Sequence, residues 1–197
     1  MRFPLRLVVV ALVVALSGCA GMRAGEGGSA AVLAHVPHET TPAGEQVVVI
    51  RDYVELDKVE DRDVRRRVQY VWNYSRGTTQ RRVWDEAGVA YETTDLPEMT
   101  LNATDPEMAW AYDQVRADPY YAGKLVASDY FWGGFSVREA HGDCGTGTRC
   151  VHVFAMRDQG RERVLHAIFD LASGKVVDHD YDAALGGVGQ PITGEVK

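Results

Sequence analysis

A cluster of acidic and histidine side chains near the end of the chain is the first group that could do chemistry. Residues 178–182 read DHDYD and place three carboxylates beside His179. Clustered carboxylate oxygens are typical ligands of a hard cation such as Ca²⁺. In an extended strand, however, Asp178, Asp180 and Asp182 share one face while His179 points to the other. The pattern therefore favours an exposed acidic strand end, and we assign no metal site to it.

Two further histidines and several serines were considered as reactive groups. His152 and His166 lie in apolar segments that we expect to be neighbouring strands, so their rings could face each other. A histidine in such a strand is more often a satisfied core or surface residue than a ligand. No serine has the Gly-x-Ser-x-Gly setting of a nucleophile elbow. We therefore predict no catalytic residue, no cofactor and a non-enzymatic role.

Two cysteines form a closely spaced pair in the stretch CGTGTRC, Cys144 to Cys150. The glycine- and threonine-rich residues between them are typical of a tight loop between antiparallel strands. A disulfide that closes so short a loop contributes about 2 kcal/mol in the chain-entropy model. The spacing is not Cys-x-x-Cys, and no second cysteine pair is present. The pair thus predicts a structural disulfide, with a redox or metal role as the weaker alternative.

Aromatic residues are abundant, and one group of them is unusually dense. The stretch DPYYAGKLVASDYFWGG, which starts at Asp118, contains Tyr120, Tyr121, Tyr130, Phe131 and Trp132. Aromatic side chains fill cores, but exposed ones bind sugars, peptides or proteins. We predict that these five residues contribute to a binding surface.

The N-terminal residues indicate where the protein is located. Two arginines, Arg2 and Arg6, precede an uncharged run, Leu7 to Leu16, which ends in Ser17-Gly18-Cys19. This order is typical of a secretory signal, and the run is shorter than the roughly 20 apolar residues that span a membrane. Leu16-Ser17-Gly18-Cys19 also resembles the lipobox of bacterial lipoproteins. The alternative is an ordinary signal peptide that ends near a cysteine.

The lipobox resemblance implies a lipid anchor on Cys19. Residues 1–18 would be removed, and Cys19 would become an acylated N-terminus attached to the membrane. Ala20 in the next position implies the outer membrane facing the periplasm, because an aspartate there often retains lipoproteins at the inner one. Loss of Arg2 and Arg6 changes the formal net charge from −7 to −9. We therefore expect no nucleic-acid partner.

The rest of the chain divides into a tether and one domain. Residues 19–45 are small, polar and interrupted by proline, so we expect a flexible tether. Residues 46–197 have the length of a single domain. Within it, strands are expected at 46–55, 68–76, 130–140, 149–158, 162–171 and 175–182, and residues 80–96 are expected to form two more, joined at Glu86-Ala87-Gly88. The charged segment 57–68 is expected to be a helical turn or a solvated loop.

One main helix interrupts these strands. Thr104 and Glu107 form a capping-box pattern, with Pro106 in the first turn. Apolar residues follow at helical spacing until Asp118-Pro119 ends the helix. The sequence therefore predicts an α+β domain, in which an antiparallel sheet of about four or more strands is packed by this helix.

The second half of the chain resembles small helix-on-sheet domains. The phrase FDLASGKVV, Phe169 to Val177, carries the resemblance, which extends over about residues 104–182. It is similar to PepSY and cystatin-like domains and to the N-terminal accessory domains of copper amine oxidases. Those accessory domains carry no catalytic residues, so the resemblance implies none for this chain. The oxidase tyrosine needs an Asn-Tyr-Asp/Glu context, whereas Asn73-Tyr74 is followed by Ser75, and the chain has no His-x-His pair for copper.

Together these features predict a lipid-anchored envelope protein with a non-catalytic binding or accessory role. Its partner would be another envelope protein or a cell-wall component. Two alternatives remain, namely a periplasmic enzyme inhibitor of the PepSY type and an envelope hydrolase that uses carboxylates or a metal. A hydrolase requires a deep polar cleft with converging titratable groups, whereas a binding protein requires a shallow aromatic surface.

Overall fold

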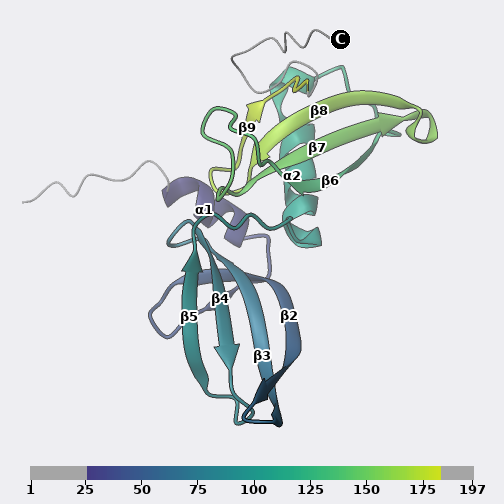
Figure 1. Ribbon diagram of the computed structural model, residues 1–197. Helices are drawn as coiled ribbons and strands as arrows, with labels where there is room; N and C mark the ends of the chain where they lie inside the picture. Colours follow the sequence, from purple (N-terminus) through teal and green to yellow (C-terminus); the bar gives the residue numbers. More distant parts are fainter. Residues whose placement is uncertain (1–25, 183–197) are drawn as a thin grey trace, which may run out of the picture.

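The computed structural model describes residues 26–182, which form two antiparallel sheets at opposite ends of the molecule (Figure 1). The first sheet has the order β1-β2-β3-β4-β5 and the second the order β6-β7-β8-β9. The strands of the first sheet are β1 (Glu39–Thr40), β2 (Gln46–Val59), β3 (Arg62–Asn73), β4 (Thr78–Trp84) and β5 (Ala90–Leu96). Those of the second are β6 (Tyr130–Ser136), β7 (Cys150–Arg157), β8 (Glu162–Asp170) and β9 (Lys175–Asp178). The helices are α1 (Glu26–Leu33) and α2 (Asp105–Ala117), with single 3₁₀ turns at Pro119–Tyr121 and Asp158–Gly160.

The predicted fold class is wrong. The described residues are mainly β, with nine strands in two sheets and one long helix, α2, rather than a cystatin-like sheet packed by a helix. Strands joined by short hairpins pair with their neighbours in the chain. The segment 97–129, which contains α2, separates the two runs of hairpins, so each run forms a sheet of its own.

The prediction for the charged segment 57–68 is also wrong, because this segment forms the tip of a long β2–β3 hairpin. Strand β2 pairs with β3 from Val47↔Asn73 out to Val59↔Arg62. Oppositely charged residues face each other across the hairpin, with Glu55 opposite Arg66 and Lys58 opposite Asp63. At the turn, Glu60 and Asp61 have φ angles of 50° and 61°. A two-residue turn with both φ values positive matches the twist of a hairpin, although its usual residues are Asn-Gly.

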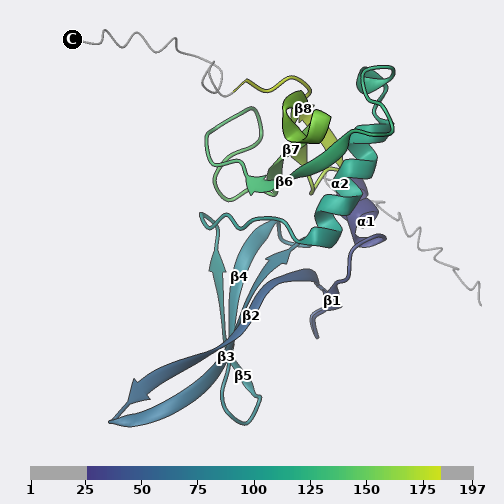
Figure 2. The same cartoon turned by 90° about the vertical axis from the view of Figure 1, so that its right-hand side faces the viewer.

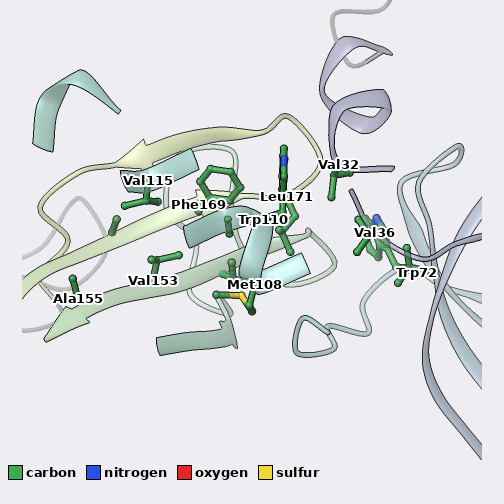
Figure 3. Packing of buried hydrophobic residues seen from close by; sticks show 14 of the residues in the cluster. Val32, Val36, Trp72, Met108, Trp110, Val115, Val153, Ala155, Phe169 and Leu171 are labelled. Atoms are coloured by element: carbon green, nitrogen blue, oxygen red, sulfur yellow. The ribbon is translucent and has the colours of Figure 1, made fainter. Parts of the chain in front are cut away.

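The second part of the expected tether is structured instead of flexible. Residues 26–33 form α1, and Glu39 and Thr40 pair with the start of β2. Val32 and Val36 are buried in the main core beside Trp72 (Figure 3). The two buried valines provide the apolar burial that the small and polar composition of 19–45 obscures.

The prediction of the main helix is confirmed. Thr104 caps α2, with a capping box in which its side chain accepts from the backbone of Glu107 and its backbone donates to the Glu107 carboxylate. The cap at the other end is Asp118, followed by Pro119. The apolar stripe of α2 includes the buried residues Met108 and Val115.

Helix α2 packs against one face of the second sheet, as Figure 2 shows from the side. Val153, Ala155 and Phe169 of β7 and β8 meet Met108, Trp110 and Val115 in the core (Figure 3). The four strands form the meander that the sequence predicted for this half. Short turns join β7 to β8 and β8 to β9, whereas the longer segment 137–149, which contains Cys144 of the disulfide, connects β6 to β7. One face of this sheet is thus buried, and its opposite face remains for other contacts.

The predicted disulfide is confirmed. Cys144 and Cys150 are bonded, with their Cα atoms 5.7 Å apart. The pair and Val137 and Ile168 form a small second core on the face of the sheet opposite α2. None of the helices within residues 26–182 is long and apolar enough to cross a membrane.

Candidate binding face

A row of ring side chains crosses the face of the second sheet opposite α2. We call it the aromatic row. Its members, in spatial order, are Phe135, Trp132, Phe154, His166, His152, Tyr181 and His141. They come from β6, β7, β8 and the segments that flank the sheet. The row alternates along β7 with the core residues Val151, Val153 and Ala155, as the two-residue period of a strand requires.

Two glycines place neighbouring aromatic residues of β6 on the same side. Trp132 and Phe135 are three positions apart, so a regular strand would point them to opposite faces. Gly133 and Gly134 have φ angles of 148° and 90°, and the register with β7 shifts between Gly133 and Ser136. A Cβ atom at Gly133 would lie 2.1 Å from the backbone oxygen of His152. The irregularity therefore depends on glycine, and it brings both rings to the outer face.

The outer end of the row is exposed. The Trp132 ring stacks on Phe154 with centroids 4.6 Å apart and planes at 18°, and the Phe135 ring meets it edge-on at 5.8 Å. Trp132 is 41% exposed and Phe135 is 50% exposed. These neighbouring rings form a preordered apolar patch on an edge strand. Such patches mark interaction sites more often than isolated surface apolar residues do.

The inner end of the row is covered by the chain itself. The backbone N–H of Tyr181 donates to the carbonyl of His166 at 2.8 Å, which carries the segment after β9 across the sheet. The Tyr181 ring lies 4.8 Å from the His166 ring and 5.2 Å from the His141 ring. His141 in turn contacts Asp178, with Nε2 and Oδ2 2.8 Å apart. The disulfide loop and residues 178–181 thus limit the accessible part of the row to its Trp132 end.

The two histidines that the sequence placed on neighbouring strands do face each other. Nδ1 of His152 lies 2.9 Å from Nε2 of His166, so one ring must donate and the other accept. Burial, and then the neighbouring His152 and Arg163, lower the pKa of His166 to about 4, although Asp178 and Asp182 oppose the shift. Burial also lowers the pKa of His152. Both rings are therefore neutral at pH 7.

The lowered pKa of His166 predicts that the protein loses stability as the pH falls. Between about pH 6.5 and pH 4, the unfolded chain binds a proton at this position that the folded chain does not. Each unit of pKa shift corresponds to about 1.4 kcal/mol, so with solvent screening we expect a loss of about 2 kcal/mol. Urea unfolding at a series of pH values measures this loss. The variant His166→Asn should show a smaller loss over the same range, and an identical pH profile for the variant would contradict the assignment.

The five aromatic residues predicted as a binding surface do not lie together. Phe131 packs into the core beside Tyr112, and Tyr121 is buried and donates its hydroxyl to the carbonyl of His179. Tyr120 is exposed but contacts Asp180 through its hydroxyl. Trp132 belongs to the aromatic row, and the exposed Tyr130 is at the start of the same strand. The sequence therefore identified one member of the row, and strand alternation explains why its neighbour in the chain, Phe131, packs against the core on the other face.

The acidic cluster forms local contacts rather than a metal site. Asp178 contacts His141 and also accepts from the backbone of Asp180 at 2.9 Å. The His179 ring lies against Tyr120, 4.5 Å between centroids, and its Nε2 is 3.2 Å from the carboxylate of Asp118. Within residues 26–182, no group of three or more histidine, cysteine or acidic side chains is arranged to hold a metal ion. Cys19 lies outside the described residues.

A buried ion pair that the sequence analysis missed joins the two sheets. Arg149, just before β7, donates from Nε and Nη2 to the two carboxylate oxygens of Glu107, at 3.0 and 2.5 Å. The hydroxyl of Tyr74, just after β3, donates to the same carboxylate at 2.6 Å, and Arg149 also donates to the carbonyl of Leu101 at 2.7 Å. Burial favours the neutral acid, but the charge and hydrogen bonds of Arg149 outweigh it and lower the pKa of Glu107. The pair holds α2 and both sheets in one arrangement.

Comparisons with known proteins identify the fold and not the family. No family model matches the sequence, and no curated protein matches it. Among solved structures, the chain is similar to part of a copper-containing benzylamine oxidase from Hansenula polymorpha, with a TM-score of 0.52 and 10% identity. The match covers 72% of this chain and 26% of that one, so this chain corresponds to about a quarter of the oxidase. At this identity the likeness shows a shared fold, which bears out the resemblance to copper amine oxidases at that level alone.

Proposed function

We propose that this chain is a lipid-anchored accessory protein of the bacterial cell envelope. It would bind another envelope protein through the exposed end of the aromatic row. The observation that carries the proposal is the patch of Trp132, Phe135 and Phe154, in which Trp132 and Phe135 are about half exposed. Rigid aromatic anchors of this kind dominate the energetics of protein interfaces.

The position of the patch supports a protein partner. Strand β6 is at the edge of its sheet, paired on one side with β7. The backbone beside Phe135 is already engaged by the chain, because the carbonyl of Gly134 accepts from the N–H of Ala103 at 3.1 Å. The contact area for a partner would therefore come from the aromatic side chains. The patch also carries no charge, because none of Trp132, Phe135 and Phe154 has an ionisable side chain. Binding at this site would therefore depend mainly on apolar contact.

A lipid anchor on Cys19 would help the patch to find an envelope partner. The lipobox-like Cys19 would attach the chain to the membrane, facing the periplasm, and residues 20–25 would connect it to α1. Attachment confines the protein to a thin layer near the membrane, which raises its effective concentration toward other envelope proteins. A weak, apolar contact surface is sufficient under those conditions.

Photo-crosslinking in intact cells tests this function. A photoreactive amino acid at Phe135, which is 50% exposed, should capture one dominant envelope protein. The matched control is the same amino acid at Val54 on the β2–β3 hairpin, which is 52% exposed and outside the aromatic row. We expect no dominant product from position 54. Equal capture from both positions would contradict the proposal, as would the absence of a product from position 135 together with turnover of a small substrate by the purified protein.

A further inference from the structure

A pocket of about 500 Å³ lies on one face of the first sheet, under the segment that leads into β2. Its floor includes side chains of β4, and its roof is formed by residues 39–45. The carboxylate of Glu39 and the guanidinium of Arg82 are 3.4 Å apart, so β1 reaches over to β4 although the two strands are not neighbours in the sheet. Figure 2 shows β1 set off to one side of this sheet. The volume falls in the range of small-molecule sites, roughly 300–1,000 Å³.

The floor and the roof of this pocket are each held in place by the chain itself. Strand alternation puts three side chains of β4, Gln80, Arg82 and Trp84, in one row along the floor, which is about 13 Å long. In the roof, the backbone N–H of Thr41 donates to the carbonyl of Glu45 at 2.8 Å. The Glu45 carboxylate in turn accepts from the buried side chain of Asn73 at 2.8 Å. The pocket is therefore formed without a ligand.

The guanidinium group of Arg82 has hydrogen-bonding capacity that the protein does not use. The side chain is 11% exposed, and its one hydrogen bond to another described residue runs from Nη1 to the Glu39 carboxylate at 3.4 Å, which is long. A guanidinium carries five N–H donors. The other nitrogen atoms of Arg82 are not among the polar atoms that are both fully buried and without a partner, so they keep accessible surface. Because Arg82 lines the pocket, acceptor atoms of a ligand there can reach these donors.

Trp84 supplies an apolar ring at the end of the same row. The side chain is half-buried and lines the pocket. The guanidinium of Arg67 lies over the ring, 5.4 Å from its centroid, and Arg67 is itself held by Asp52 through a hydrogen bond of 2.9 Å. The ring is therefore fixed beside polar side chains that include both donors and acceptors. This combination suits a sugar, whose ring has an apolar C–H face and a rim of hydroxyl groups.

The charges of the lining favour a neutral ligand. Two carboxylates, those of Glu39 and Glu45, and two guanidinium groups, those of Arg76 and Arg82, line the pocket. Arg76 is also bonded to Asp95. An anion would be repelled by the two carboxylates and a cation by the two guanidinium groups, so the lining selects neither. We infer that this pocket binds a short neutral oligosaccharide, whose hydroxyl or amide oxygens accept from Arg82 and one of whose sugar rings lies against Trp84.

Calorimetric titration of the full chain with N,N′,N″-triacetylchitotriose, a neutral trisaccharide, tests the inference. We expect saturable 1:1 binding. Two comparison probes are trigalacturonic acid, a trisaccharide that carries carboxylates, and N-acetyl-trialanine amide, a neutral peptide. Each should bind at least about tenfold more weakly than triacetylchitotriose. Binding of triacetylchitotriose that does not saturate, or an equal affinity for either comparison probe, would overturn the inference.

Matched variants locate the site. Trp84→Ala and Arg82→Met should each weaken binding of triacetylchitotriose at least about fivefold. The controls are Tyr53→Ala and Arg62→Met, which should leave binding unchanged. Tyr53 is exposed on the opposite face of the same sheet, because it pairs through Val68 with Val83, the neighbour of Trp84 in the chain. Equal affinities for the Trp84→Ala and Tyr53→Ala variants would contradict the assignment of the site.

The indole N–H of Trp84 gives a readout that does not depend on the stability of a variant. In the ¹⁵N-labelled full chain, the Nε1–H signal that is lost in Trp84→Phe belongs to Trp84. This signal should move when triacetylchitotriose is added, whereas the signals of the other three tryptophans should not. An unmoved Trp84 signal at saturating trisaccharide would overturn the inference.

Discussion

Replacing Arg149 by methionine should lower the free energy of unfolding by about 3–5 kcal/mol, the usual cost of removing one partner of a buried ion pair. Methionine fills a similar volume, so the loss would come from the carboxylate of Glu107, which would remain buried without its cation. Three of the donors of Arg149 are also lost, including the one to Leu101. Urea unfolding at pH 7 measures the effect directly.

Two further variants separate the charge from the packing. Adding Glu107→Gln to Arg149→Met should recover part of the loss, because a neutral amide does not leave a buried charge uncompensated. Arg62→Met at the hairpin tip is the exposed control, since its contact with Glu60 is 3.6 Å long and both side chains are mostly exposed. We expect it to change stability by less than about 1 kcal/mol. A loss at Arg149→Met no greater than at Arg62→Met would show that the buried pair does not hold the two sheets together.

Replacing Phe169 by alanine should cost about 3–5 kcal/mol, the range for a fully buried aromatic side chain. Phe169 is completely buried between the second sheet and α2, and its ring meets Trp110 edge-on at 5.5 Å. Its removal would leave a void that neighbouring strands cannot close without moving. Thermal or urea unfolding of the variant gives the measurement.

The matched control for Phe169→Ala is the same substitution on the opposite face of the same sheet. Phe135 is half exposed and outside the buried core. Phe135→Ala should therefore cost less than about 1 kcal/mol, in line with surface substitutions. If the two variants were equally destabilised, the assignment of a buried face and an open face to this sheet would be wrong.

Local features of the sequence were reliable where one short pattern determines the structure. The Thr104–Glu107 capping box correctly gave the start of α2, and the glycine-rich spacing of Cys144 and Cys150 correctly gave the disulfide. The strands of the second sheet were also found, because short turns separate apolar runs there. In each case the residues that decide the outcome lie within a few positions of one another.

Features that depend on distant partners were missed. The charges of residues 57–68 suit a two-stranded hairpin when oppositely charged residues face each other across it, as in Lys58 opposite Asp63. The packing of the two sheets against α2 involves the contact of Arg149 with Glu107, which are 42 positions apart. Neither pairing has a local signature, and so the predicted fold class failed even though most elements were correct.

The candidate site was predicted in part for the same reason. Trp132 was identified by the density of aromatic residues around it, but Phe131 next to it is in the core. Strand alternation would have separated these two residues. The glycine pair Gly133-Gly134 is the signal for Phe135, because it indicates an irregular strand that returns Phe135 to the outer face. The facing of His152 and His166 was anticipated from the two apolar strands, whereas the contribution of Phe154 required the register between them.

The most direct test of the proposed binding face is the yield of the crosslinked product from position 135 when Trp132 is also replaced by alanine. Truncation of a central aromatic anchor costs about 2 kcal/mol or more, or about 30-fold in affinity. We therefore expect the dominant product to fall at least about tenfold, while the free energy of unfolding stays within about 1 kcal/mol of the parent. An unchanged yield in a correctly folded Trp132→Ala variant would contradict the role of the aromatic row in binding.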